Sequence, residues 1–237
     1  MTLAHTVELA IATPVALAMG VLALTPAIDA YRRAALRRLV PGICAVLEAH
    51  AIDYWCDFGT LLGFYRERDI IRGDKDADLS IFESDRPRLM ALARAFTARG
   101  YEITDQGGRL RNVIRIYDAR TRYYADVYPY REEGGVLRSL VASPQEDIPA
   151  ALVARRVTAS FLGATVRVPD NVEGVLRHRY GPAFRTPRRG DKGATRPYSR
   201  LRSIVEDLQD NSLGIWSWLT RFNGLNRFNR LRRPQNR

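Results

Sequence analysis

The chain contains the segment Gly59-Thr60-Leu61-Leu62-Gly63 and, shortly after it, Asp74-Lys75-Asp76-Ala77-Asp78-Leu79-Ser80-Ile81. In the second segment acidic and apolar residues alternate, which predicts a β-strand. Side chains alternate between the two faces of a strand, so we expect Asp76 and Asp78 on one face and their apolar neighbours in a core. Cα atoms two residues apart on a strand are about 6.5 Å apart, so both carboxylates can bind one divalent cation.

A second predicted strand carries another acid. In Tyr123–Tyr128, Asp126 lies on the face opposite to that of its apolar neighbours. If the two strands are neighbours, three carboxylates converge, and such a cluster repels itself unless a cation binds inside it. The pattern therefore indicates a Mg²⁺ or Mn²⁺ site made by Asp76, Asp78 and Asp126. The alternative is a solvated strand face whose acids form ion pairs with nearby arginines, namely Arg66, Arg68 and Arg72.

The glycine-containing segment predicts a helix start in front of these acids. Gly59 and Thr60 follow a predicted strand, and the first turn of a helix offers free N–H groups and the positive end of the helix dipole. Most such pairs only cap a helix. Because this pair precedes two strand carboxylates, we expect Gly59 and Thr60 to bind a phosphate group.

Taken in order, these motifs resemble those of the LicD and fukutin-related group of nucleotidyltransferase-fold proteins. The resemblance covers residues 30 to 190 and includes Tyr124–Tyr128 as the third acidic strand. It continues through Phe161–Pro169 and ends at Tyr180-Gly181. Several motifs in the same order make this a fairly specific match.

The resemblance implies an α/β (α+β) fold with a short mixed sheet flanked by helices. It also implies Mg²⁺-dependent transfer of a phospho-alcohol group, of the phosphocholine or polyol-phosphate type, from a CDP-linked donor to a hydroxyl of a glycan or glycolipid. Such a reaction modifies cell-surface glycans. Asp76 and Asp78 would hold the cation on the diphosphate, and Asp126 would complete the metal site or take the acceptor's proton. The implied substrate contacts are Gly59, Thr60, Arg66 and Arg72.

Two departures from the family pattern leave other functions open. Gly73 stands where the family commonly has Trp, and Lys75 where it commonly has another acid or His. One alternative is a catalytically silent, membrane-associated member that binds nucleotide or glycan. The other is a nucleotidyltransferase that adds a nucleoside monophosphate to a small molecule or nucleic acid. We rank nucleic acid lowest, because the basic residues lie beyond the site rather than within it.

Length, composition and cysteine content fit an intracellular enzyme domain. A chain of 237 residues with 46% hydrophobic residues can form one good-sized domain with extensions. Cys44 and Cys56 lack metal-ligand spacing, so we expect two buried, reduced thiols, with a disulfide as the alternative. We divide the chain into residues 1–29, a catalytic domain at 30–190 and a tail at 191–237.

The two extensions suggest contact with a membrane. Residues 9 to 28 are twenty uncharged positions, just enough to cross a bilayer as a helix, but Pro14, Gly20 and Pro26 weaken this prediction. The arginines that follow would keep the domain on the cytoplasmic face of the membrane, or the protein is cytoplasmic. From Arg185 onward, thirteen basic and four acidic residues supply most of the net charge of +11. This basic, aromatic tail fits an anionic membrane surface or packs on the domain.

The remaining pattern predicts the order of the other elements. Arg111 and Arg115 would reach a phosphate or lie solvated on a sheet face, and His178 would be a surface or packing histidine. The expected elements are a helix at 30–50 with a kink or split at Pro41-Gly42, strands at 52–58, 110–117 and 122–130, a helix from Asp85, a hairpin about Gly163, and a helix capped by Asp170 that ends near Tyr180-Gly181.

Overall fold

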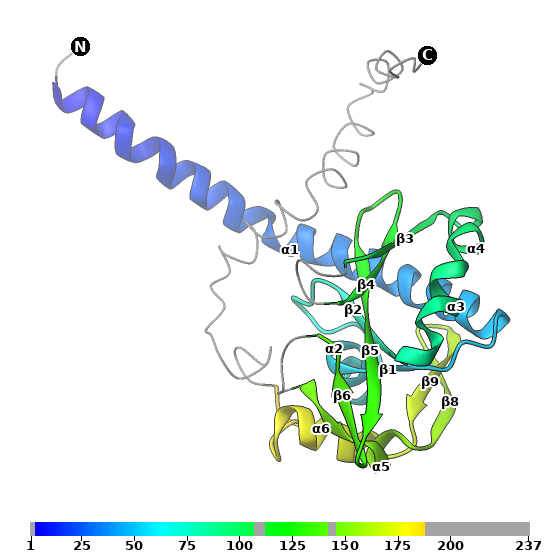
Figure 1. Cartoon of the computed structure of the whole chain (residues 1–237). Coiled ribbons are helices and arrows are strands. Elements are labelled where there is room, and N and C mark those ends of the chain that lie inside the picture. Colours follow the sequence, from blue (N-terminus) through cyan, green and yellow to red (C-terminus); the bar gives the residue numbers. More distant parts are fainter. Residues whose placement is uncertain (1–2, 107–111, 142–145, 188–237) are drawn as a thin grey trace, which may run out of the picture.

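The computed structural model describes residues 3–106, 112–141 and 146–187, with side chains from residue 26 onward (Figure 1). The predicted tail at 191–237 lies outside the described residues, as do Arg111 and the start of the strand predicted at 110–117.

A mixed sheet of seven strands organises the described part of the chain. Its main path is β1-β2-β5-β4-β3, and β6 and β7 extend it from β5. β2 and β5 pair in parallel, whereas the other neighbours are antiparallel. This confirms the short mixed sheet that the sequence predicted. The strands are β1 Tyr54–Cys56, β2 Ala77–Phe82, β3 Tyr101–Asp105, β4 Ile114–Asp118, β5 Tyr124–Glu133, β6 Val136–Ser139 and β7 Ile148–Pro149.

The predicted hairpin about Gly163 forms a separate two-stranded sheet. β8 Arg156–Phe161 and β9 Ala164–Pro169 pair antiparallel through a two-residue turn. Both turn residues have positive φ, 53° at Leu162 and 77° at Gly163. Two positive φ values match the right-handed twist of the flanking strands.

The first helix is longer than predicted. α1 runs from Leu3 to Ala49 as one helix of 47 residues and passes through Pro41 and Gly42 without a break. Its N-terminal part projects from the domain and its C-terminal part lies along it (Figure 1). Gly42 allows β3 to approach, because a Cβ there would lie 1.8 Å from the hydroxyl of Tyr101. Within the described chain, no helix combines the length and apolarity that crossing a bilayer requires.

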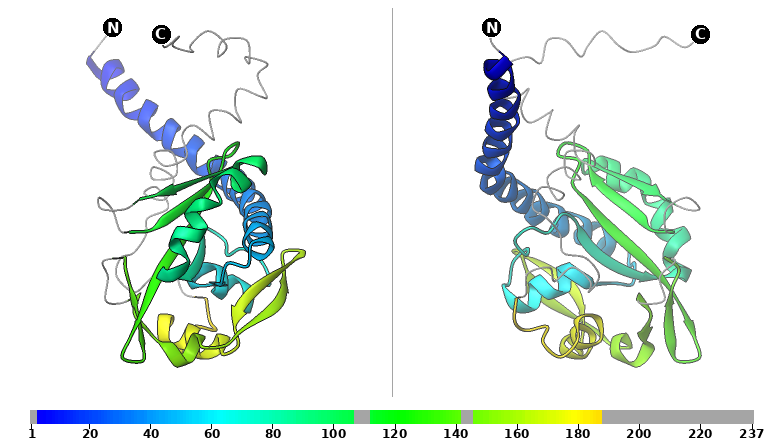
Figure 2. Two further views of the ribbon diagram at one scale, coloured as in Figure 1. Left: turned by 45° about the vertical axis from the view of Figure 1, so that its right-hand side comes forward. Right: turned by 90° about the vertical axis from the view of Figure 1, so that its left-hand side faces the viewer.

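The shorter helices surround the sheet. α1 and α4 contact each other and pack with α3 on one side of the sheet (Figure 2), whereas α2 contacts β2 and α6. α6 is capped by Asn171, whose side chain accepts from Gly174 N, and not by Asp170 as predicted. Asp170 instead donates its N–H to Arg155, which keeps it at the end of the hairpin. The helices are α2 Phe58–Arg66, the 3₁₀ turn Glu83–Asp85, α3 Arg86–Ala91, α4 Ala93–Ala98, α5 Ala150–Val153 and α6 Val172–Tyr180.

The core lies between α1 and the sheet. Leu36, Leu39 and Ile43 of α1 are fully buried, together with Leu79 of β2 and Val127 of β5. The two cysteines, Cys44 and Cys56, are free and buried, as predicted.

A buried ion pair joins the start of α2 to α6. Asp57, the N-cap of α2, is fully buried, and its Oδ2 lies 2.7 Å from Nη2 of Arg179, whose side chain is 2% exposed. The carboxylate also accepts from Phe58 N, Trp55 Nε1 and Ser80 Oγ. Breaking a buried, well-bonded pair leaves one charge without compensation, which destabilises a fold more than loss of a surface pair does.

Arg179→Met should therefore lower the free energy of unfolding by about 3–5 kcal/mol. The control is Arg177→Met, an exposed arginine on the same helix, which should change it by less than about 0.5 kcal/mol. Urea unfolding followed by circular dichroism measures both. Equal stability of the two variants would show that the Asp57–Arg179 pair does not hold α6 in place.

Candidate active site

The parallel pairing of β2 and β5 brings two of the three predicted acids side by side. Asp78 is the register partner of Asp126, and each is 7% exposed. The strands are neighbours, as the convergence of the acids required. Asp76 lies just before the first residue of β2 and is partly exposed. The predicted strand is therefore present as β2, but it is buried along most of its length, and Asp76 lies in the bend that leads into it rather than on the strand as predicted.

The start of α2 fixes the carboxylate of Asp78. Gly59 N donates to Oδ2 of Asp78 at 2.8 Å, and Asp78 N donates to Oγ1 of Thr60 at 2.8 Å. Gly59 and Thr60, which the sequence predicts as phosphate contacts, thus both form hydrogen bonds with Asp78 in this structure. These two bonds orient Asp78.

Asp74 is a further acid beside Asp78, and the sequence pattern did not predict a role for it. A turn in which Asp74 N donates to Ile71 O returns the chain toward α2. A Cβ on Gly59 would lie 2.5 Å from Oδ2 of Asp74 and 3.0 Å from Oδ2 of Asp78. Both oxygens therefore border the space that the missing side chain leaves. The sequence already showed Asp74 at the start of the acidic run Asp74–Asp78. A strand that continued back through Asp74 would not have brought this residue to Gly59, so its position could not be predicted from the strand pattern.

The third acid, Asp126, pairs with an arginine. Arg115 lies directly opposite Asp126 on β4, and its Nε is 2.7 Å from Oδ1. The guanidinium also lies 4.3 Å from the ring centroid of Tyr124. Burial acts to lower the pKa of Arg115, but the charge of Asp126, the charge of Tyr124 and the hydrogen bonds to Asp126 and Tyr117 together outweigh burial and raise this pKa. The sequence predicts Arg115 as a phosphate contact or a solvated charge, and did not predict this ion pair with Asp126.

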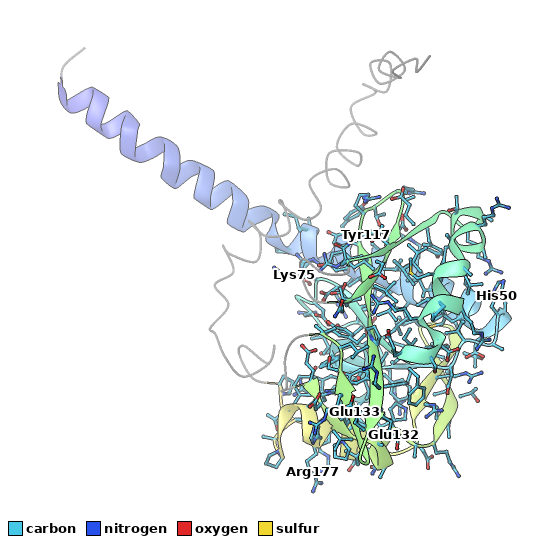
Figure 3. All side chains as sticks on the ribbon, viewed as in Figure 1. His50, Lys75, Tyr117, Glu132, Glu133 and Arg177 are labelled. Atoms are coloured by element: carbon cyan, nitrogen blue, oxygen red, sulfur yellow. The ribbon has the colours of Figure 1, made fainter. Side chains whose placement is uncertain are left out.

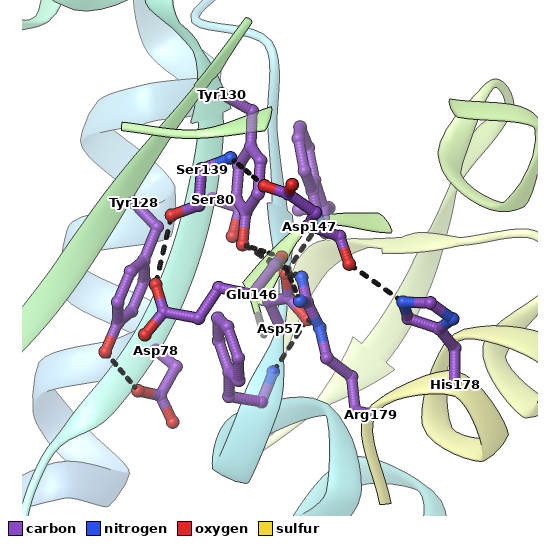
Figure 4. Close-up of polar contacts among 12 residues, drawn as sticks. Asp57, Asp78, Ser80, Tyr128, Tyr130, Ser139, Glu146, Asp147, His178 and Arg179 are labelled. Atoms are coloured by element: carbon purple, nitrogen blue, oxygen red, sulfur yellow. Dashed lines mark hydrogen bonds and ion pairs between the residues drawn. The ribbon is translucent and has the colours of Figure 1, made fainter. Parts of the chain in front are cut away.

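Tyr128 of β5 lies close to the acids at the start of β2 and on β5. The hydroxyl of Tyr128 is 3.4 Å from Oδ1 of Asp78 (Figure 4). Burial raises the pKa of Tyr128 well above its usual value, and the charges of Asp78, Asp126 and Asp76 raise it further. The negative charges of all three predicted acids therefore act on the hydroxyl of Tyr128.

Tyr180, at the end of α6, lies in the same field. Its pKa is raised well above the usual value by burial and then by the charges of Asp78, Asp74 and Asp57. The sequence motif Tyr180-Gly181 had marked this position without giving it a role. The charges of Asp74 and Asp78 therefore act on the hydroxyl of Tyr180 as well.

The other predicted residues make contacts within the fold or lie at the surface. Arg66, in the last turn of α2, donates to the carbonyl oxygens of Phe184 and Thr186. Arg72 is exposed in the loop before β2. His178 is exposed, and its ring nitrogen Nε2 lies 2.8 Å from the carbonyl oxygen of Asp147, which confirms a surface histidine.

Lys75, the departure from the family pattern, is buried beside the acidic turn. It lies toward the end of the domain that α1 crosses, away from Glu132, Glu133 and Arg177 (Figure 3).

The donor set fits a hard divalent cation. It consists of carboxylate oxygens, which Mg²⁺ and Mn²⁺ prefer. In the ranges that the structure describes, no group of three or more His, Cys, Asp and Glu side chains is arranged to hold an ion by itself. Mg²⁺ at phosphate-transfer sites is usually bound by one or two carboxylates and by substrate phosphates. The two oxygens of Asp74 and Asp78 beside Gly59 meet that requirement.

Several known proteins are similar to this chain. The ribitol 5-phosphate transferases FKRP of Mus musculus and Homo sapiens are each 27% identical over 157 residues, which cover 62% of this chain and 31% of theirs. The human ribitol-5-phosphate transferase FKTN is 29% identical over 105 residues, 44% of this chain and 22% of its own length. The chain therefore spans about a third or less of these relatives.

A solved structure is also similar. The crystal structure of ANT(2″)-Ia in complex with adenylyl-2″-tobramycin has a TM-score of 0.44 and 17% sequence identity, and the match covers 81% of this chain and 98% of that one.

The family assignment comes from a match to a family model. The model described as LicD/FKTN/FKRP, nucleotidyltransferase domain, matches residues 51–171, which is more than half of the chain. The match contains the glycine segment, the acidic turn and both strands that carry Asp78 and Asp126. The chain belongs to the LicD/FKTN/FKRP family of nucleotidyltransferase domains.

Proposed function

We propose that this protein transfers a phospho-alcohol group, of the polyol-phosphate or phosphocholine type, from a CDP-linked donor to a hydroxyl of a glycan or glycolipid. The observation that carries the proposal is the placement of Asp78 beside Asp126 on parallel strands, next to the space over Gly59 that Asp74 also borders. The relatives named ribitol 5-phosphate transferases support the reaction class.

The acids would hold Mg²⁺ or Mn²⁺ together with the donor's diphosphate. Asp78 is the central ligand in this proposal, because Gly59 and Thr60 already orient it. Asp76 and Asp74 would add oxygens from the turn. When bound, the cation would supply charge neutralisation on the diphosphate as the nucleotide leaves.

The chain's own residues would then direct a single displacement. The acceptor hydroxyl oxygen forms a bond to the alcohol-bearing phosphorus, and the bond from that phosphorus to the bridging oxygen breaks, so that CMP leaves. The proton of the hydroxyl passes to the carboxylate of Asp126, which lies beside Asp78. Tyr128 and Tyr180 would limit water at the acids, because both are partly buried and the charges of these acids act on both.

The test uses the purified protein with Mg²⁺ or Mn²⁺ and a panel of CDP-ribitol, CDP-glycerol and CDP-choline. Release of CMP that depends on a glycan acceptor is the expected result. Release of pyrophosphate from a nucleoside triphosphate would indicate nucleotidyl transfer instead. Binding of CDP without release of either product would indicate a silent member of the family.

Removing single carboxylates should stop the reaction. Asp78→Asn and Asp76→Asn should each reduce the metal-dependent rate, by about 10³-fold at Asp78, because a charged ligand is replaced by a neutral one of the same shape. The free energy of unfolding should stay the same or rise slightly, since repulsion among the acids falls. The control is Asp170→Asn, an exposed acid paired with Arg155 at the hairpin end. Near-normal rates in both site variants would contradict the metal assignment.

Filling the space over Gly59 should have a similar effect through a different cause. The added Cβ of Gly59→Ala would push aside the carboxylates of Asp74 and Asp78. We expect a loss of activity of about 10²-fold, as for a ligand displaced by about 1 Å. Stability should change by less than about 1 kcal/mol, since alanine is a good helix residue. Steady-state kinetics and a thermal melt measure the two effects, and an unchanged rate would show that the cation lies elsewhere.

A further inference from the structure

Arg115 contacts the one predicted site acid that lies on β5. Its Nε and Nη2 lie 2.7 and 3.5 Å from the two oxygens of Asp126. The side chain of Arg115 is 30% exposed, whereas that of Asp126 is 10% exposed. The arginine therefore reaches the acid from the solvent side.

This contact conflicts with the role proposed for Asp126. A carboxylate that is hydrogen-bonded to a guanidinium is a weaker ligand for a second cation and a weaker base for a proton. Arg115 must therefore either remain as a permanent partner of Asp126 or leave it when substrate binds. The two cases differ in whether the arginine contributes to binding of the donor.

The chemistry of the guanidinium favours exchange. Its planar fork of donors matches both carboxylate and phosphate oxygens. The group also lies over the ring of Tyr124, 4.3 Å from its centroid, so that a contact with the ring can persist while the hydrogen-bond partner changes. Partial exposure leaves the outer edge of the guanidinium accessible to an incoming anion.

We infer that Arg115 is an exchangeable residue: it neutralises Asp126 in the free protein and turns to the diphosphate of the donor when donor and cation bind, which releases Asp126. This inference rests on the proposed function and adds a binding residue to it. In the free protein Arg115 offsets part of the repulsion among Asp76, Asp78 and Asp126. In the complex it supplies one charge-assisted hydrogen bond to phosphate.

Exchange predicts effects of opposite sign when Arg115 is removed. Without nucleotide, Arg115→Gln should bind Mn²⁺ at least about threefold more tightly, because a competing positive charge is gone. With saturating Mn²⁺, it should bind CDP about tenfold more weakly, because a charge-assisted hydrogen bond is lost. If Arg115 is a permanent partner of Asp126, Arg115→Gln can still tighten Mn²⁺ binding, because the same charge is removed, but it should leave the affinity for CDP unchanged.

Titration of free Mn²⁺ by electron paramagnetic resonance measures the first affinity, and calorimetry with CDP measures the second. The matched control is Arg122→Gln. Arg122, in the loop between β4 and β5, also forms an ion pair, with Glu102 of β3, and also lies over a tyrosine ring, that of Tyr117, at 4.7 Å. It should leave both affinities unchanged.

A second variant keeps the inference testable if Arg115→Gln does not fold. Arg115→Lys retains the charge but loses the fork, so Mn²⁺ affinity should stay near that of the wild type while CDP affinity falls. Unchanged CDP affinity in Arg115→Lys, or unchanged or weaker Mn²⁺ binding in Arg115→Gln, would overturn the exchange while leaving the proposed function intact. If the wild type binds neither Mn²⁺ nor CDP, the proposed function fails and the exchange fails with it.

Discussion

The site depends first on the buried pair between Asp57 and Arg179. The carboxylate of Asp57 receives hydrogen bonds from β1, from β2 and from the first residue of α2, and the guanidinium reaches it from α6, 122 residues later. Asp57 thereby sets where α2 begins, and the next residue but one, Gly59, donates to Asp78. A shift of this helix start would turn the Gly59 N–H away from Asp78 and change the space that two carboxylates border.

The parallel pairing of β2 with β5 is the second constraint. It places acids that are 48 positions apart in the sequence directly opposite each other, Asp78 beside Asp126. Because both are largely buried, their mutual repulsion must be offset. The fold does so locally, through the Gly59 N–H at Asp78 and through Arg115 at Asp126. A site organised in this way is ordered before a ligand arrives and still carries the negative charge that a divalent cation requires.

Sequence patterns predicted the parts that depend on local order. Alternation located β2 and β5, and glycine chemistry located the hairpin at Gly163. The absence of metal-ligand spacing predicted the two buried thiols. Contacts between distant segments were not visible. The pairing of Asp57 with Arg179 and the approach of Asp74 to Gly59 both depend on how the chain turns back on itself. Asn171 caps α6 in place of the predicted Asp170, because the backbone N–H of Asp170 is hydrogen-bonded to the carbonyl oxygen of Arg155 at the end of the hairpin.

The central claim is the position of the cation, and anomalous diffraction tests it directly. Crystals grown with Mn²⁺ and CDP would be measured near the manganese absorption edge. The account predicts an anomalous peak in contact with Asp78, on the side of its carboxylate that borders Gly59, with a phosphate oxygen of CDP as a further ligand. A peak remote from Asp78, or CDP bound with no peak near these acids, would contradict it.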